Sequence, residues 1–162
     1  MSAAAPSGVS EARSVKALLQ RVSTAAVQVG GEVVGEIGPG LLVFLGLDKG
    51  DDRVVAGRLL EKLLAYRVFA DAAGRMNRSV ADIKGGVLLV SQFTLAADTG
   101  KGLRPGFSRA LPPTEAQPLY DYMLAELRRC HAPVAAGRFG ADMQVSLVND
   151  GPVTFILECT AS

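Results

Sequence analysis

The stretch that decides the fold runs from Val145 to Leu157 and reads VSLVNDGPVTFIL. Apolar and polar residues alternate on both sides of Asp150, Gly151 and Pro152, a pattern typical of half-buried strands. Asp-Gly between such runs is a strong signal for a β-hairpin, so we expect the two runs to fold back on each other. A two-residue turn does not require a proline directly after its glycine, and Pro152 therefore needs a separate explanation.

Further strands are expected from apolar runs that are bounded by glycine or proline. They cover residues 16–29, 32–37, 40–47 and 85–95. The first three follow one another closely, separated by Gly30-Gly31 and by Gly38-Pro39-Gly40, which favours a meander of β-structure.

Two helices are expected as well. The pair Asp51-Asp52 can cap a helix that runs to about Tyr66, and a second helix is expected over residues 114–129. Thr114 and Gln117 match a capping box at the start of the second helix. The apolar faces of the two helices carry Val55, Leu59, Leu63, Leu119, Met123 and Leu127.

These elements predict an α+β fold. Strands and helices do not alternate regularly enough for a doubly wound parallel sheet. We therefore expect mixed, mostly antiparallel sheets that form a barrel-like β core with two main helices. Residues 15–162 are expected to form a single domain, and residues 1–14, which are small, polar and without periodicity, a flexible N-terminal extension.

Composition restricts the compartment and the partners. The 17 basic and 16 acidic side chains nearly cancel, which disfavours a strongly basic nucleic-acid binder but leaves room for a small basic face. Cys130 and Cys159 form no Cys-x-x-Cys pair and follow no secretory leader, which favours a cytoplasmic protein with free thiols. The longest apolar stretch is far shorter than the ~20 residues of a membrane-spanning helix.

The usual equipment of a hydrolase is nearly absent. His131 is the single histidine, and although it follows Cys130, adjacent residues on a helix do not face each other. A role at the surface of a helix end is therefore favoured over a Cys-His dyad. Too few nitrogen and sulfur ligands are present for a zinc site, so we expect no metal, and no glycine-rich phosphate-binding motif follows a strand.

The segment Ser91 to Asp98, SQFTLAAD, admits two interpretations. In the first, it continues a central strand, with Phe93 and Leu95 toward the core and Gln92 and Thr94 on the other face. In the second, the polar residues at the end of an apolar run build a functional site, because loops at strand ends often carry function. The residues alone leave both interpretations open.

SQFTLAAD and NDGPVT together resemble the signature pair of the D-aminoacyl-tRNA deacylases, which remove D-amino acids from tRNA. The resemblance extends to LLQRV, GEIGPGLLVFLGL, GRMN and GRFGADMQVSLVNDGPVTF, and covers residues 16–158. It implies hydrolysis of the ester of D-aminoacyl-tRNA without a cofactor.

The resemblance also explains the proline. It implies a cis Gly151–Pro152 bond whose two carbonyls point into the site of a partner subunit, so that the active sites lie at a homodimer interface. Rejection of L-aminoacyl-tRNA is then steric, and glycyl-tRNA should pass the same filter because glycine has no side chain. Arg21 would brace the dipeptide.

Catalysis is expected to be assisted by the 2′-OH of the substrate's terminal ribose, so that no protein base is needed. The resemblance assigns the stabilisation of the oxyanion to the backbone N–H groups of Phe93 and Thr94, and the shape of the pocket to Ser91 and Gln92. A threonine hydroxyl without a base is a weak nucleophile, so we expect Thr94 to act through its backbone.

The resemblance places Phe139 and Met143 in a pocket for the terminal adenosine of the tRNA. Lys101, Arg104 and Arg109 either touch phosphates or are merely solvated. Two other functions remain open: an RNA-binding module without chemistry, and a homodimeric structural or interaction protein.

Overall fold

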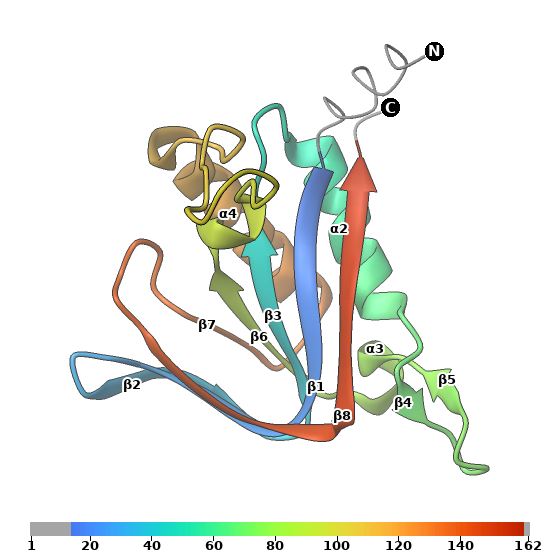
Figure 1. Cartoon of the computed structure of the whole chain (residues 1–162). Coiled ribbons are helices and arrows are strands. Elements are labelled where there is room, and N and C mark those ends of the chain that lie inside the picture. Colours follow the sequence, from blue (N-terminus) through green and yellow to red (C-terminus); the bar gives the residue numbers. More distant parts are fainter. Residues whose placement is uncertain (1–13, 161–162) are drawn as a thin grey trace, which may run out of the picture.

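The computed structural model describes residues 14–160 (Figure 1). The predicted N-terminal extension, residues 1–14, lies outside the described residues except for Ser14, which begins the first strand. The described chain forms one six-stranded sheet, a separate two-stranded sheet and three α-helices. The predicted mixed α+β fold with a barrel-like β core is confirmed.

Strand β1 (Ser14–Val29) is the centre of the sheet. Its first half pairs with β3 (Gly40–Gly46) and its second half with β2 (Glu32–Ile37), both antiparallel. Its other edge pairs along almost its whole length with β8 (Gln144–Thr160). The strands predicted over residues 16–29, 32–37 and 40–47 are therefore confirmed within a residue or two.

The predicted hairpin around Gly151 is wrong. The two apolar runs do not pair with each other but form one long strand, β8, which bends sharply at this point and follows β1 on both sides of the bend (Figure 1). Gln20 pairs with Thr154, and Val22 pairs with Asn149. Residues 150–153 therefore lie opposite Arg21 alone. They form an enlarged bulge that bends the strand and does not reverse it.

The remaining strands add parallel pairs and curl the sheet. Strand β6 (Gly86–Ser91) runs parallel to β3, and β7 (Val134–Ala136) runs parallel to β6. Strand β2 then approaches β7, which nearly closes the sheet into a barrel. This approach depends on Gly35, because a Cβ there would lie 2.5 Å from the carbonyl oxygen of Ala136.

Both faces of the sheet are buried, which explains the uninterrupted apolar runs of β3 and β6. Alternate residues of β3 and β6, such as Leu41 and Leu89, face the helices. The residues between them, such as Leu42 and Leu88, fill the interior of the barrel. The two halves of the core thus share the same strands.

Helices α2 (Arg53–Ala65) and α4 (Pro113–Cys130) cover one face of the sheet (Figure 1). Asp52 caps α2 as predicted, and its carboxylate accepts a hydrogen bond from the Val55 N–H at 3.0 Å. The predicted capping box at Thr114 and Gln117 is wrong, since α4 begins after Pro112 without a side-chain cap. A proline at the first helical position lacks an N–H, so one fewer donor needs a cap there.

Like β7, three further small elements of the fold were not predicted from the sequence. Strands β4 (Phe69–Ala70) and β5 (Met76–Arg78) form a hairpin at the end of the molecule near the bend of β8, with Phe69 buried and β5 exposed (Figure 1). Helix α3 (Val80–Ile83) follows, capped by Ser79 in a capping box with Asp82. Among the described residues no helix is long and apolar enough to cross a membrane.

Tyr120 ties α4 to the sheet from inside the core. Its side chain is almost completely buried, and its hydroxyl donates a hydrogen bond of 3.1 Å to the carbonyl oxygen of Leu89 on β6. Burial raises the pKa of Tyr120 to about 12, because a phenolate would lose its hydration there.

This shift predicts a loss of stability at high pH. Between the ordinary tyrosine pKa near 10 and about 12, the unfolded chain releases a proton that the folded chain retains, so the free energy of unfolding falls as pH rises. The total loss should be roughly 2–3 kcal/mol. Tyr120→Phe should remove this contribution and cost about 1 kcal/mol at neutral pH, where the hydrogen bond is lost.

Denaturant unfolding as a function of pH measures both effects. Tyr122→Phe is the matched control, because Tyr122 lies on the same helix, half-buried, with its ring 4.5 Å from the guanidinium carbon of Arg53. An alkaline slope that is equal in wild type and in Tyr120→Phe would contradict the prediction.

Candidate active site

The segment SQFTL leaves the sheet earlier than a continuous strand would. Strand β6 ends at Ser91, and Phe93–Ala96 form a 3-10 helix, η1. The interpretation of this segment as a strand with Phe93 in the core is therefore wrong, since Phe93 is 59% exposed. The absence of a side chain at Gly46 lets η1 pack closely against the end of β3, because a Cβ on Gly46 would lie 2.6 Å from the Cβ of Leu95.

The first residues of η1 present polar groups at the surface. The Gln92 N–H donates to the carbonyl oxygen of Leu45 at 2.8 Å, which holds the entry to the turn. The Gln92 side-chain amide donates to the hydroxyl of Thr94. The N–H groups of Phe93 and Thr94 lie at the start of η1, where a helix offers them no internal acceptor.

A pocket of about 430 Å³ opens beside η1. Ser91, Gln92 and Phe93 form one side, and Phe139 and Met143 line it as well. The structure thus brings five of the predicted site residues to one pocket, whose volume lies in the range of small-molecule sites, ~300–1,000 Å³. The other lining residues are Leu45, Leu47, Val90, Leu111, Pro113, Gly140, Ala141, Asp142 and Val145.

The wall of the pocket that contains Phe139 is supported by Tyr120 of α4. Phe139 lies in the turn between β7 and β8, and its ring packs against Tyr120, with 5.7 Å between the ring centroids. Met143 approaches Gly137 so closely that a Cβ there would lie 2.7 Å from its sulfur. The pocket therefore has packed walls, mostly apolar, with few polar groups among them.

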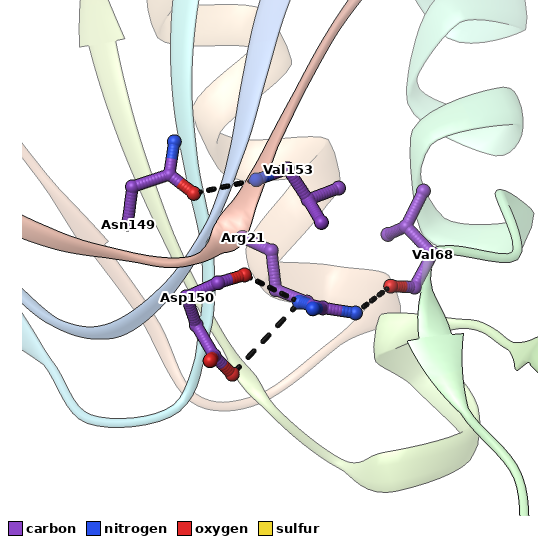
Figure 2. A network of polar contacts seen from close by, with 5 residues as sticks. All are labelled: Arg21, Val68, Asn149, Asp150 and Val153. Carbon is purple, nitrogen blue, oxygen red and sulfur yellow. Dashed lines mark hydrogen bonds and ion pairs between the residues drawn. The ribbon is translucent and has the colours of Figure 1, made fainter. Parts of the chain in front are cut away.

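The second predicted part of the site is the bend of β8, which we call the Gly-Pro corner (residues 149–153). The Gly151–Pro152 bond is cis, as the resemblance implies, and a second cis bond, Ala132–Pro133, was not predicted. Arg21 reaches into the corner (Figure 2). Its guanidinium donates to the carbonyl oxygens of Asp150 at 2.9 Å and of Val68 at 2.8 Å.

Asn149 completes the Gly-Pro corner from the other side. Its side-chain oxygen accepts a hydrogen bond from the Val153 N–H at 2.7 Å, so the side chain bridges the bulge (Figure 2). Its amide nitrogen donates to the Thr154 hydroxyl at 2.8 Å. The residues on both sides of Gly151 and Pro152 are thereby fixed, while the dipeptide itself stays exposed.

The Gly-Pro corner and the pocket lie at opposite ends of the sheet. Arg21 pairs with Leu41 on β3, and Leu41 pairs with Val87 near the start of β6. Ser91 ends β6, about 13 Å further along at ~3.3 Å per residue. Within one chain, the Gly-Pro corner is therefore too far away to line the pocket.

The basic residues after η1 divide into two groups. Lys101 and Arg104 are exposed on a projecting loop. Arg109 instead lies 3.7 Å from the buried carboxylate of Asp48, which anchors the end of the loop to the fold.

The histidine and the two cysteines, the residues from which hydrolases commonly build a nucleophile and its base, lie outside this pocket. His131 ends α4, and its Nε2 is 2.6 Å from the carbonyl oxygen of Gly85, before the start of β6 and far from Ser91. Cys130 is exposed, and Cys159 is a free, half-buried thiol on β8. Among residues 14–160 no group of three or more histidine, cysteine, aspartate or glutamate side chains is arranged to hold a metal ion.

Sequence reasoning missed several residues that support the site. Tyr120 packs against the ring of Phe139, and Asp48 pairs with Arg109 at the end of the loop that follows η1. Val68 contributes only its backbone carbonyl, which accepts a hydrogen bond from Arg21. Asn149 did carry a signal, because asparagine and aspartate next to a turn commonly bond to nearby backbone.

The fold and the pocket define an α+β protein with a nearly closed sheet and an apolar pocket at a strand end. Similar architecture occurs in two solved structures, each matched over 90% of this chain and 99% of the other. The c-Myc DNA Unwinding Element Binding Protein superposes with a TM-score of 0.86 at 42% sequence identity. A probable eukaryotic D-amino acid tRNA deacylase superposes with a TM-score of 0.79 at 16% identity, which shows a shared fold.

Sequence comparison identifies the family. The chain belongs to the D-Tyr-tRNA(Tyr) deacylase family, whose model matches residues 18–158. It is 62% identical over 144 residues to a D-aminoacyl-tRNA deacylase of Stutzerimonas stutzeri, covering 89% of this chain and 99% of the relative. It is 60% identical over 145 residues to the protein of the same name in Pseudomonas paraeruginosa, covering 90% and 100%.

The Arg21 network yields a prediction about stability. A lysine at this position cannot donate to the Asp150 and Val68 carbonyls with a rigid planar fork, so one acceptor loses its partner. Arg21→Lys should lower the free energy of unfolding by about 1–2 kcal/mol.

Chemical denaturation of wild type and variant gives this difference directly. Arg58→Lys on the exposed face of α2 is the matched control and should be neutral within about 0.5 kcal/mol. A change at Arg21 no larger than that of the control would show that the double hydrogen bond contributes nothing.

Proposed function

We propose that this protein hydrolyses the ester bond of D-aminoacyl-tRNA and releases free D-amino acid and tRNA. The observation that carries the proposal is the pocket, in which the SQFTL residues Ser91, Gln92 and Phe93 meet Phe139 and Met143. The family match and the names of the relatives support the same reaction. Aminoacyl-tRNA is used by ribosomes in the cytoplasm, and we propose that the protein acts there.

The pocket receives the terminal adenosine of the tRNA. A nearly flat, apolar base fits between side chains such as Phe139 and Met143, and a few polar groups fix its orientation. Tyr120 supports this arrangement because it holds the ring of Phe139 against the fold. The ester then lies at the mouth of the pocket, beside η1.

The N–H groups of Phe93 and Thr94 stabilise the oxyanion that forms when water attacks the ester. Both lie at the start of η1, where the helix itself does not use them, and fixed donors of this kind need no reorganisation during the reaction. The Thr94 hydroxyl accepts a hydrogen bond from the Gln92 side chain, an amide that cannot act as a base, and none of the hydrogen bonds found among residues 14–160 gives it another partner that would activate it. Thr94 therefore acts through its backbone.

The 2′-OH of the terminal ribose assists the attack. His131, the single histidine of the chain, is bound to the Gly85 carbonyl near the opposite end of β6 and cannot serve as a base at η1. The substrate carries its own hydroxyl next to the ester, and a group held so close needs no further positioning by the protein.

The chirality filter comes from a partner subunit. The Gly-Pro corner is remote from the pocket of its own chain, so the carbonyls of Gly151 and Pro152 reach an active site only across a homodimer interface. The exposed apolar side chain of Ile156 on β8 supports a contact surface that is covered in the dimer.

The filter works by exclusion and not by recognition. A rigid pair of carbonyls near the α-carbon admits a hydrogen atom but no side chain on that side, so every L-amino acid is rejected whatever its side chain. Arg21 and Asn149 hold the residues on both sides of the dipeptide. Glycyl-tRNA, which has hydrogen on both sides, is accepted.

The decisive experiment compares D-Tyr-tRNA with L-Tyr-tRNA. We expect the purified protein to release D-tyrosine rapidly and to leave the L-ester at its spontaneous rate, a difference of at least about 100-fold, because the steric exclusion is complete. Loss of the ester is followed by acid precipitation of labelled tRNA. Binding of tRNA without ester loss would favour an RNA-binding module, and neither binding nor hydrolysis would favour a structural protein.

A second experiment locates the assisting hydroxyl. D-Tyr-tRNA that ends in 2′-deoxyadenosine, charged on its 3′-oxygen, should still bind but should be hydrolysed at least about 100-fold more slowly, since general base assistance is worth ~10²–10⁴-fold. Single-turnover rates at saturating enzyme separate this effect from a lost contact. Equal rates for the deoxy and ribo substrates would rule out assistance by the 2′-OH.

A further inference from the structure

A loop next to the pocket has a fixed shape and an unusual tip. Residues 98–106 are closed at their base by two backbone hydrogen bonds between Asp98 and Gly106, of 2.7 and 2.9 Å. The Asp98 carboxylate accepts a further hydrogen bond from the Gly100 N–H at 2.9 Å. We call this segment the tip loop; its side chains are exposed.

The tip loop is anchored directly beside the candidate active site. Phe107, which follows it, packs against Phe93 of η1 with 5.1 Å between the ring centroids. Two residues after Phe107, the guanidinium of Arg109 lies 3.7 Å from the buried carboxylate of Asp48, and the Arg109 carbonyl oxygen accepts a hydrogen bond from the Lys49 N–H at 2.8 Å. Arg104 is three residues before Phe107, and three residues of extended chain span at most about 10 Å. The tip therefore lies close to Phe93 at the mouth of the pocket.

The tip combines positive charge with an apolar side chain. Leu103 is fully exposed, at 104% of the reference area, between Lys101 and Arg104. No acidic residue occurs between Thr99 and Arg109. An open depression of about 370 Å³ lies here, lined by Thr99, Gly102, Leu103, Arg104 and Pro105.

This chemistry fits a single-stranded nucleic acid. Proteins bind single strands by pairing cations with the backbone phosphates and apolar surface with the faces of unpaired bases. A double helix would offer its phosphates but no free base face for Leu103. The small net charge of the chain, +1, does not oppose this, because Lys101 and Arg104 lie together on one loop that carries no acidic side chain between them.

We propose that the tip loop binds the single-stranded nucleotides that precede the terminal adenosine of the tRNA. Lys101 and Arg104 contact their phosphates, and Leu103 contacts a base or ribose face. The proposal rests on the proposed function, because the adenosine in the pocket directs the preceding nucleotides toward this loop.

The test uses the double variant Lys101→Ala/Arg104→Ala and two substrates. On D-Tyr-tRNA, kcat/KM should fall by about tenfold at physiological salt, and its log–log slope against salt should weaken by about 1.4, or 0.7 for each lost phosphate contact. On adenosine that carries D-tyrosine on its 3′-oxygen, the change should stay within about twofold, since this substrate has no preceding nucleotide. Leu103→Ala should lower kcat/KM for the tRNA substrate by about threefold, with an unchanged salt slope.

The control is Arg58→Ala/Lys62→Ala, which removes the same charge from the exposed face of α2. Its salt slope should remain that of the wild type. An equal loss on both substrates, an unchanged slope or an unchanged rate in the tip-loop variant would overturn the proposal.

Binding of uncharged tRNA keeps the proposal separate from the proposed function. Wild type should bind intact tRNA more tightly than tRNA trimmed of its single-stranded 3′ nucleotides, and this difference should be smaller in the tip-loop variant, which keeps only the contribution of the adenosine pocket. If wild type hydrolyses neither D-ester, the proposed function fails, and this comparison still decides whether the tip loop binds the strand. A wild type that binds both tRNAs equally refutes the tip-loop proposal.

Discussion

The antiparallel pairing of β1 with β8 is the constraint on which the rest of the structure depends. One edge of β1 is shared between β3 and β2, and its other edge is occupied almost throughout by β8. The extra residues of β8 opposite Arg21 cannot be paired, so the strand turns there and the sheet curls. At this point the backbone pairing of the two strands is interrupted, and the guanidinium of Arg21 donates hydrogen bonds to the carbonyl oxygens of Asp150 and Val68. The geometry of the Gly-Pro corner is thus a property of the sheet and not of a loop.

The elements that the sequence predicted well are those whose signals are local. Helix α2 has a capping aspartate and apolar residues at a spacing of four, and the first strands are separated by glycines that mark their turns. The error at Asp150-Gly151 has the opposite cause. A hairpin signal describes only the neighbouring residues, whereas β1 offers an edge long enough to hold both halves of β8. A partner far away in the sequence decided the pairing.

The candidate site shows the same division. The apolar run that ends at Ser91 predicted a strand, but the exit into η1 depends on Gly46, a residue of another strand that leaves space for Leu95. Contacts to backbone carbonyls, such as those of Val68 and Leu89, leave no mark in a side-chain pattern. The roles assigned to Phe139 and Met143 came from resemblance to a family, and the residues alone would have placed both in the core.

The pairing of the two ends of the described chain has a consequence for biosynthesis. Val15 pairs with Cys159 and Gln28 with Gln144, so the central ladder joins residues that lie almost the whole chain apart. Contacts of such high sequence separation form slowly, because a large loop must close before they contribute. On the ribosome, β1, β2 and β3 can assemble as a local meander, but one edge of β1 stays open until β8 has emerged. Completion of the sheet, and with it of the Gly-Pro corner, therefore waits for the synthesis of β8, more than a hundred residues after β1.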